Sequence, residues 1–536
     1  MPNNFADLFE HAVDAMPDRI AVIEGERRVT FRELEGRANQ LAHHLAAAGI
    51  GHDAHVGFQM HNSVETLEVL LACFKLRAVP ININYRYGAE ELRYLFDNAD
   101  LAALVHHRCY APTVDVVRPR VPGLRHVLVV EDDQGGAGLP SGSVPYAAAF
   151  ENTSAERDFE PRSSDDRFVM YTGGTTGLPK GVVWRQEDMW RVLGGGIDFY
   201  TGVPVADEYQ QSRTGAQNDP WLWFVLPPLI HAAAMMPTFN ALWSGSGVVF
   251  EPRFDPRRVW QVVAAQRPQV LVITGDAMAR PLIDALRAEP ADTSSVLSIG
   301  SGAALLSQPV KNAMLELLPQ TVLTDSIGSS ETGFGGIGFA QKDDDPGRGP
   351  RVQIGRGALV VDDEGAPVAP GGEGWVAKTG NVPIGYYKDP ERSAELFRTV
   401  GGARTVVTDD RARVEPDGSI TLLGRGNMVI NTGGEKVFTE EVEAVVKAHP
   451  AVYDAVVIGV PHERWGQQVA AVVAAAGPEP IDFVDLQRHV RAHLAGYKLP
   501  RRIWVVAEVG RTPSGKPDYR WAKELAAGRV PDHDAD

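Results

Sequence analysis

The sequence has few cysteines, no long apolar run and no signal segment, and each absence excludes a class of protein. Two of the 536 residues are cysteine, Cys73 and Cys109, which is too few for a disulfide-stabilised fold and is typical of a reducing compartment. No segment approaches the roughly 20 consecutive apolar residues of a membrane-spanning helix, so no integral membrane segment is expected. The first residues lack the basic and apolar regions of a signal peptide, and we therefore expect a cytoplasmic protein.

The chain also lacks an excess of positive charge. It has 69 acidic residues and 52 Lys or Arg, which gives a formal net charge of −17. Nucleic acids require a basic face, so no nucleic-acid partner is expected, and an anionic ligand must be bound by a local cluster of donors. The contents of 44% hydrophobic and 23% charged residues are ordinary for a soluble enzyme. At about 150 residues per domain, the length predicts roughly two to four units.

A P-loop of the Walker A type is missing as well. The nearest match is the string Gly510–Lys516, but Pro517 stands where that motif requires Ser or Thr to bind Mg²⁺. This absence disfavours a P-loop kinase or ATPase.

A glycine- and threonine-rich segment, residues 171–181, follows a short apolar run. Glycines let the backbone turn sharply and approach a ligand closely, and successive N–H groups in such a turn bind anions. Threonine hydroxyls and a lysine add further donors. The pattern predicts a loop that wraps a polyphosphate; the alternative is a mobile turn between two strands. The predicted phosphate-binding residues are Thr172, Gly173, Gly174, Thr175, Thr176, Gly177, Leu178, Pro179 and Lys180.

Helix and strand patterns alternate along the chain, which predicts α/β layers. Apolar spacing predicts helices over residues 5–15 and 31–48, the second capped by Thr30 with Glu33 three residues on. A helix over 440–447 and strands over 452–460, 469–475 and 503–506 are predicted near the end of the chain. The pairs at 43–44 and 106–107 are histidines without metal-ligand spacing, and we expect them to be solvated.

The loop at 171–181 resembles the phosphate-binding signature of the acyl-adenylate-forming superfamily, which includes acyl-CoA synthetases, peptide-synthetase adenylation domains and beetle luciferases. Further motifs follow in that family's order over about residues 5–525. The resemblance implies an α/β fold with a large N-terminal domain, residues 1–424, of layered β-sheets and helices that includes a small β-barrel-like part. It also implies a hinge at 425–427 and a small, mobile α+β C-terminal domain, residues 428–536.

Several motifs resemble the family's nucleotide-binding parts. The segment 300–305 resembles the adenine-side loop, and 328–333 resembles the aromatic-Gly-x-Ser/Thr-Glu motif, although Ile327 stands at the usual aromatic position. A carboxylate beside a triphosphate suits Mg²⁺, so Glu331 and Thr176 are the implied metal-side residues. The implied ATP-binding residues outside the phosphate loop are Gly302, Ala303, Ser330, Asp410, Arg425 and Lys516.

The resemblance also assigns the later part of the chain. Lys516 is implied as the adenylation lysine, and Asn427 stands at the hinge position where the family usually has Asp or Lys. Asp409 replaces the glycine that normally precedes the ribose-binding aspartate. The implied CoA-side residues are Gly433, Gly434, Glu435 and Lys436.

The implied function is an ATP-dependent acyl-CoA ligase. It adenylates a hydrophobic carboxylic acid, releases pyrophosphate, and then transfers the acyl group to CoA with release of AMP. His231 is implied beside the acyl pocket, and the predicted catalytic residues are His231, Lys516, Glu331 and Thr176. Two stretches, 172–190 and 429–437, most resemble actinobacterial ligases of steroid side-chain acids; medium- or long-chain fatty acids are the other substrates considered.

Other functions are also compatible with parts of the pattern. An adenylating enzyme that delivers its acyl group to a carrier protein is the main alternative to a CoA ligase. A non-catalytic nucleotide or acyl sensor would usually have lost the lysine or the glutamate, and both Lys516 and Glu331 are present. The expected partners are thus a small carboxylic acid, ATP, Mg²⁺ and CoA, and the sequence allows a homodimer.

Overall fold

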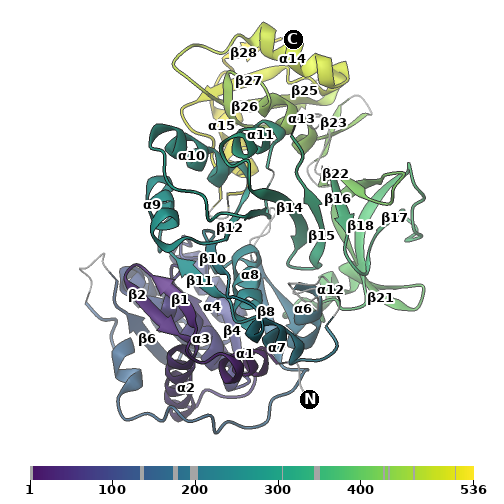
Figure 1. The fold of residues 1–536 in the computed structure, drawn as a ribbon. Coiled ribbons are helices and arrows are strands. Elements are labelled where there is room, and N and C mark those ends of the chain that lie inside the picture. Colours follow the sequence, from purple (N-terminus) through teal and green to yellow (C-terminus); the bar gives the residue numbers. More distant parts are fainter. Residues whose placement is uncertain are drawn as a thin grey trace.

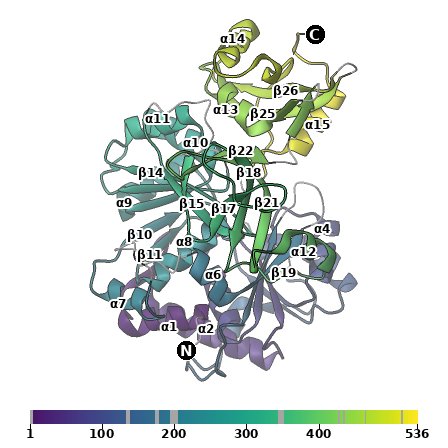
Figure 2. The same cartoon turned by 90° about the vertical axis from the view of Figure 1, so that its right-hand side faces the viewer.

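The computed structural model describes residues 4–132, 138–172, 179–193, 203, 205–304, 306–342, 351–425, 429–432, 435–462, 465–512 and 515–535. In this part of the chain the strands form three sheets. Two sheets lie in a large N-terminal part, and the third lies in a smaller C-terminal part, residues 429–535, at one end of the molecule (Figures 1 and 2).

One sheet of the N-terminal part contains the strands on either side of the predicted phosphate loop. Its order is β19-β9-β8-β4-β3-β5-β6-β7, parallel from β8 to β7 and antiparallel from β8 through β9 to β19. Its strands are β3 (His55–Gln59), β4 (Val79–Asn82), β5 (Leu101–His107), β6 (His126–Val130), β7 (Val144–Pro145), β8 (Arg167–Thr172), β9 (Lys180–Arg185) and β19 (Gly385–Tyr386).

The other N-terminal sheet runs in the order β17-β18-β21-β22-β16-β15-β14-β13-β12-β10-β11-β1-β2, with β20 paired to β21. Its parallel half comprises β1 (Ile20–Glu24), β10 (Leu222–Val225), β11 (Gly247–Phe250), β12 (Val270–Ile273), β13 (Ser298–Ser301) and β14 (Val322–Ser329), with β2 (Arg27–Thr30) antiparallel at the edge. Its antiparallel half comprises β15 (Gly333–Phe339), β16 (Arg351–Ile354), β17 (Ala358–Val361), β18 (Glu373–Thr379), β20 (Phe397–Val400), β21 (Ala403–Val414) and β22 (Ile420–Arg425). This antiparallel half corresponds to the small β part that the sequence predicts.

Helices cover both sheets, which produces alternating layers. Between the sheets lie α1 (Phe5–Ala15), α2 (Phe31–Ala47), α3 (Val64–Lys75), α6 (Gln186–Leu193) and α8 (Ala232–Trp243), packed with Phe5, Phe74, Phe168 and Trp243 in one buried core. The outer face of the larger sheet packs on α9 (Pro256–Gln266), α10 (Gly275–Ala288) and α11 (Gln308–Leu317). The outer face of the other sheet packs on α4 (Ala89–Asn98) and α5 (Ala111–Val117). Two peripheral helices are α7 (Gln210–Ala216) and α12 (Pro390–Leu396).

The C-terminal part is an α+β unit. Its sheet order is β24-β23-β26-β27-β28, with β25 paired to β26. Its elements are β23 (Val429–Thr432), β24 (Glu435–Phe438), α13 (Thr439–Lys447), β25 (Val452–His462), β26 (Gly466–Ala475), α14 (Phe483–His493), β27 (Arg502–Val506), α15 (Tyr519–Gly528) and β28 (His533–Asp534). The helix and three strands predicted for this region are therefore confirmed, while the boundaries at 424 and 428 stay predictions.

Local sequence signals fix several helix ends. Thr30 Oγ1 accepts the N–H of Glu33 and the Glu33 carboxylate accepts the N–H of Thr30, which is the predicted capping box of α2. One prediction is wrong: His106 and His107 lie on β5, which is covered on both faces, and they are 0% and 5% exposed. Burial lowers the pKa of His106 to about 4, so this imidazole is neutral. Within the described residues, each helix is too short or too polar to cross a bilayer.

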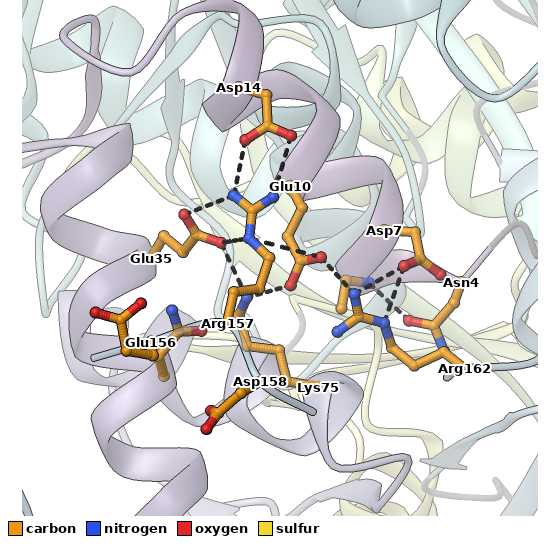
Figure 3. A network of polar contacts seen from close by, with 12 residues as sticks. Asn4, Asp7, Glu10, Asp14, Glu35, Lys75, Glu156, Arg157, Asp158 and Arg162 are labelled. Carbon is orange, nitrogen blue, oxygen red and sulfur yellow. Dashed lines mark hydrogen bonds and ion pairs between the residues drawn. The ribbon is translucent and has the colours of Figure 1, made fainter. Parts of the chain in front are cut away.

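A buried network of charges ties the first helices to the loop at 157–162 (Figure 3). Lys75 at the end of α3 is fully buried and donates to Glu10 of α1 and, at 3.2 Å, to Glu35 of α2. Arg157 binds Glu35 at 2.7 Å, and Arg162 binds Glu10. Burial disfavours the ionised form of Glu10, but Lys75 and Arg162 outweigh it, so the pKa of Glu10 is lowered. The network holds the buried Lys75 and Arg162, together with the partly exposed Arg157, against carboxylates.

Candidate active site

The predicted phosphate loop connects β8 to β9. Thr172 and Lys180 face each other across the antiparallel ladder, and Tyr171 faces Gly181. A Cβ on Gly181 would lie 2.8 Å from the Tyr171 ring, so this position requires glycine. Lys180 forms an ion pair with Asp389 at 2.9 Å. The loop residues Gly173, Gly174, Thr175, Thr176, Gly177 and Leu178 lie outside the described residues, and Pro179 precedes β9.

Asn82, the last residue of β4, joins the strand before this loop to the segment before α8. Its Oδ1 accepts the N–H of Tyr171 at 2.7 Å, and its Nδ2 donates to the carbonyls of Tyr171 at 2.8 Å and Ile230 at 2.7 Å. All three groups are buried. Sequence reasoning missed Asn82, because its partners are 89 and 148 residues away and no local motif marks it.

His231 caps α8 beside Ile230 and lines a pocket together with Asn82 and Tyr171. Burial lowers the pKa of His231 to about 4, and the positive charge of Lys516 adds to this effect, so the ring is neutral at physiological pH. Its Nε2 has no hydrogen-bond partner among the described residues. His231 therefore offers an unused polar atom to a ligand in this pocket.

Glu331 and Ser330 lie in a tight turn between β14 and β15. The Ser329 hydroxyl accepts the N–H groups of Glu331 and Thr332, both at 3.2 Å, which fixes the turn. Two side chains from distant segments hold it: Trp184 Nε1 donates to the Ser330 carbonyl at 2.8 Å, and the Tyr386 hydroxyl donates to Glu331 Oε1 at 3.0 Å. Neither partner was identified from the sequence.

The same turn brings the predicted metal-side residue close to the phosphate hairpin. The Lys180 ammonium lies 5.3 Å from the centre of the Tyr386 ring, and the Tyr386 hydroxyl reaches Glu331. No group of three or more His, Cys, Asp or Glu side chains in the described ranges is arranged to hold a metal. A single carboxylate fits Mg²⁺ nonetheless when phosphate oxygens of the substrate supply the other ligands.

The predicted adenine-side loop follows β13. Ala303 has a φ of 63°, in the left-handed region that residues with a Cβ rarely adopt. Such strained backbone often occurs at ligand sites. Ile327 stands at the position where an aromatic residue was expected. It packs against an apolar cluster of the antiparallel half-sheet that includes Val352, and a Cβ added at Gly335 would lie 3.4 Å from it.

The predicted ribose-side residues are brought together by strand pairing. Asp410 on β21 faces Arg425 at the end of β22 across the antiparallel ladder. The hinge residue Asn427 lies outside the described residues. The predicted CoA-side segment is a hairpin in which Thr432 pairs with Glu435 and Asn431 pairs with Lys436; Gly433 and Gly434 at its tip are not among the described residues.

Lys516 lies on a loop of the C-terminal part that contacts the N-terminal part. Gly515 packs against the start of α10, where an added Cβ would lie 3.2 Å from both Thr274 Oγ1 and the Ala277 side chain. The positive charge of Lys516 also contributes to the lowered pKa of His231. The structure thus brings Lys180 and the Glu331 turn to the same tyrosine, Tyr386, from segments far apart in the sequence.

Sequence comparison supplies the family. A model of AMP-binding enzymes matches residues 9–387, and a model of the AMP-binding enzyme C-terminal domain matches residues 441–516. The chain belongs to the AMP-binding enzyme family. The resemblance that the motifs indicated is therefore confirmed.

Members of this family that resemble the whole chain include two curated ligases. The chain is 48% identical over 540 residues to the 3-oxocholest-4-en-26-oate–CoA ligase of Rhodococcus rhodochrous, covering 99% of this chain and 97% of the relative. It is 50% identical over 532 residues, with the same coverages, to the medium/long-chain-fatty-acid–CoA/3-oxocholest-4-en-26-oate–CoA ligase of Mycobacterium tuberculosis.

Solved structures confirm the predicted fold class. The anthranilate CoA ligase AuaEII in complex with anthranoyl-AMP superposes with a TM-score of 0.84 at 23% identity, covering 98% of each chain. ATP-bound MatB from Rhodopseudomonas palustris superposes with a TM-score of 0.82 at 24% identity, covering 97% of this chain and 99% of MatB. At these identities the likeness concerns the fold.

Proposed function

We propose that the protein is an ATP-dependent acyl-CoA ligase for hydrophobic carboxylic acids of the steroid side-chain or medium- to long-chain fatty acid class. The observation that carries this proposal is the identity of 48% and 50%, over 99% of the chain, to ligases named for these acids. The geometry of the candidate site is compatible with it, because Lys180 and Glu331 both lie beside Tyr386, and Tyr171 of the same hairpin lines the pocket beside His231.

The first half-reaction needs no nucleophilic side chain. The carboxylate of the acid attacks the α-phosphorus of ATP, the bond to the β-phosphate oxygen breaks, and pyrophosphate leaves. Catalysis is then positioning together with stabilisation of charge on the phosphoryl oxygens. We assign these roles to Thr172, the phosphate loop, Lys180 and Lys516, with Ser330 near the α-phosphate.

Two further groups complete the nucleotide site in this proposal. Gly302 and Ala303 contact the adenine through the backbone, and Asp410 with Arg425 binds the ribose. Glu331, held by Tyr386, and Thr176 would bind Mg²⁺ together with the phosphates. The ion, when bound, neutralises charge on the phosphate oxygens.

The second half-reaction replaces AMP by a thiol. The CoA sulfur attacks the acyl carbonyl carbon, the bond to the AMP phosphate breaks, and the thiol proton is released to solvent. We assign the CoA side to the hairpin at 433–436, and we propose that residues 428–536 move relative to 1–424 about a hinge at 425–427 that includes Asn427.

The acid binds, in this proposal, in the pocket beside His231. The residues that follow, Ala232 to Ala234, have small side chains, which is compatible with a bulky apolar substrate. Because burial keeps His231 uncharged, the ring contacts an apolar acid without a charge to desolvate.

The test is AMP formation by the purified protein with ATP, Mg²⁺ and a hydrophobic acid, measured with and without CoA. We expect stoichiometric acyl-CoA and AMP only when CoA is present. Pyrophosphate release that is independent of CoA, with transfer to a carrier protein, would favour the carrier-protein alternative.

Assembly and location complete the proposal. The acidic composition and low cysteine content are in line with a cytoplasmic enzyme, and a homodimer is compatible with the sequence. Light scattering of the purified protein decides between one and two chains. Fractionation of the source cells decides the location.

A further inference from the structure

A charged cluster lies where the C-terminal part meets α10, outside the pocket. Asp276 belongs to α10 of the N-terminal part, whereas Lys447 ends α13, Asp454 lies on β25 and Arg511 precedes the Lys516 loop. The side chains of Asp276 and Lys447 are 1% exposed, and those of Asp454 and Arg511 are 13% and 14% exposed. Four charges are thus buried at the contact between the two parts.

Within the C-terminal part, Arg511 connects Asp454 to the residue before Lys516. Its Nε and Nη2 donate to the two carboxylate oxygens of Asp454 at 2.7 and 2.5 Å, and its Nη1 donates to the Gly515 carbonyl at 2.8 Å. Thr512 adds a second restraint, because its N–H donates to the Lys516 carbonyl at 2.8 Å and its Oγ1 accepts the Lys516 N–H at 3.1 Å. The backbone of Lys516 is therefore held on both sides.

Gly515 explains why this loop can reach the N-terminal part. Its φ is +76°, a conformation that glycine adopts at little cost, and it lies against Thr274 and Ala277 at the start of α10. The Arg511–Gly515 bond thus restrains the backbone immediately before Lys516.

Lys447 links this support to the N-terminal part. Its ammonium lies 3.5 Å from Asp454 Oδ1 and 3.8 Å from Asp276 Oδ2. The other oxygen of Asp276 accepts the N–H of Ser307 at 2.8 Å, at the end of the segment that contains Gly302 and Ala303. Asp276 therefore contacts both Ser307, two residues beyond the predicted adenine-side segment, and the C-terminal part.

Neighbouring groups add further contacts between the two parts. Arg280 of α10 lies 3.7 Å from Asp276 Oδ2 and 5.5 Å from the ring centre of Tyr453, and the Tyr453 hydroxyl lies 3.3 Å from Asp284 Oδ2. Burial disfavours the ionised form of Asp454, but Lys447 and Arg511 outweigh it, so the pKa of Asp454 is lowered. Asp454 is therefore ionised over the neutral range and paired with Arg511.

We propose that Asp454 and Arg511 are positioning residues for Lys516, and that the Lys447–Asp276 ion pair holds the C-terminal part where Lys516 faces the pocket. The cluster then serves acyl-adenylate formation and not the thioester step. An interaction that exists in only one of two arrangements shifts the population toward that arrangement. This inference rests on the proposed function, because it divides that reaction into two steps.

The first test measures the two half-reactions separately in the full-length protein. Asp454→Asn removes the charge that binds Arg511 and Lys447 while keeping the side-chain shape. We expect acyl-adenylate formation, followed as pyrophosphate release without CoA, to fall at least tenfold, as in Lys516→Ala. Thioester formation from synthetic acyl-adenylate and CoA should stay within about twofold. Asp534→Asn, which affects an exposed pair with Arg502 on the same part, is the matched control.

A parallel loss of both half-reactions, or no loss in either, would overturn the positioning role. Asp276→Asn keeps an oxygen for the Ser307 N–H and removes the charge that faces Lys447 and Arg280. We expect it to slow adenylation about three- to tenfold, and the double variant with Lys447→Met to be no slower than the more affected single variant. Additive losses would refute the pair.

A second test needs no substrate and therefore separates this inference from the proposed function. Spin labels at Arg287→Cys on α10 and Arg491→Cys on α14, in a Cys109→Ser background, report the distance between the two parts; both positions are exposed. We expect one narrow distance distribution, which Asp276→Asn broadens. An unchanged distribution would overturn the inference even in an active ligase, whereas a wild-type protein that adenylates no acid would refute the proposed function alone.

Discussion

Replacing Asn82 by alanine should lower stability and adenylation more than replacing an exposed asparagine, because Asn82 joins the phosphate hairpin to the His231 segment. The substitution removes three buried hydrogen bonds, one from the Tyr171 N–H and two to the carbonyls of Tyr171 and Ile230. A buried polar group without a partner costs about 1–3 kcal/mol. Because Asn82 lines a pocket that water can enter, we expect a total loss of about 3 kcal/mol rather than the full sum.

The assays are a thermal unfolding curve and pyrophosphate release with a hydrophobic acid. We expect the melting temperature to fall by about 3 °C and adenylation to fall at least tenfold, since small displacements of reacting groups cost large factors in rate. The control is Asn218→Ala, whose side chain makes one exposed bond to the Thr214 carbonyl. Equal behaviour of the two variants would refute the role of Asn82, and a lower melting temperature with full activity would reduce it to stability alone.

Three further substitutions test other parts of the structure. Lys75→Met leaves two buried carboxylates short of a cation and should lower the free energy of unfolding in urea by about 3 kcal/mol. Lys388→Met, in an exposed pair, should lower it by less than about 1 kcal/mol. Similar losses in the two variants would contradict the buried network. Tyr386→Phe removes the hydrogen bond to Glu331 and should lower kcat/KM for ATP about tenfold, and an unchanged value would exclude that support. Burial raises the pKa of Glu443 to about 7, so between pH 4.5 and 7 the folded protein binds a proton at Glu443 more tightly than the unfolded chain does. The free energy of unfolding therefore falls by up to about 3 kcal/mol as the pH rises through that window. Burial also raises the pKa of Glu24 to about 7, so Glu443→Gln should reduce this dependence in melting curves from pH 5 to 8 without abolishing it, and an unaltered dependence would assign it to other groups.

The elements that the sequence predicts well are those with local signals. The capping box of α2 and the strands of the C-terminal part follow from residue spacing alone, because helix caps and apolar alternation act within a few residues. His106 and His107 were expected to be solvated, and this was wrong because the layers that cover β5 come from distant segments.

The residues of the candidate site also fall into those that a local motif marks and those that it does not. Glu331 and Lys516 stand in motifs of fixed order, so the resemblance finds them. Asn82, Trp184 and Tyr386 support the site through bonds that span 148, 146 and 55 residues, and no local pattern specifies such pairs. Supporting residues of this kind become visible only when the fold brings the segments together.

The most direct test is acyl-CoA formation by the purified protein, measured by mass spectrometry with ATP, Mg²⁺ and CoA. The acids compared are acetate, octanoate, palmitate, an aryl acid and a C26 steroid acid. We expect the C26 steroid acid or the longer fatty acids to yield acyl-CoA and AMP in equal amounts, and Lys516→Ala to abolish both products. Activity confined to acetate or the aryl acid, or a Lys516→Ala variant with full activity, would contradict a ligase of hydrophobic acids that uses this lysine.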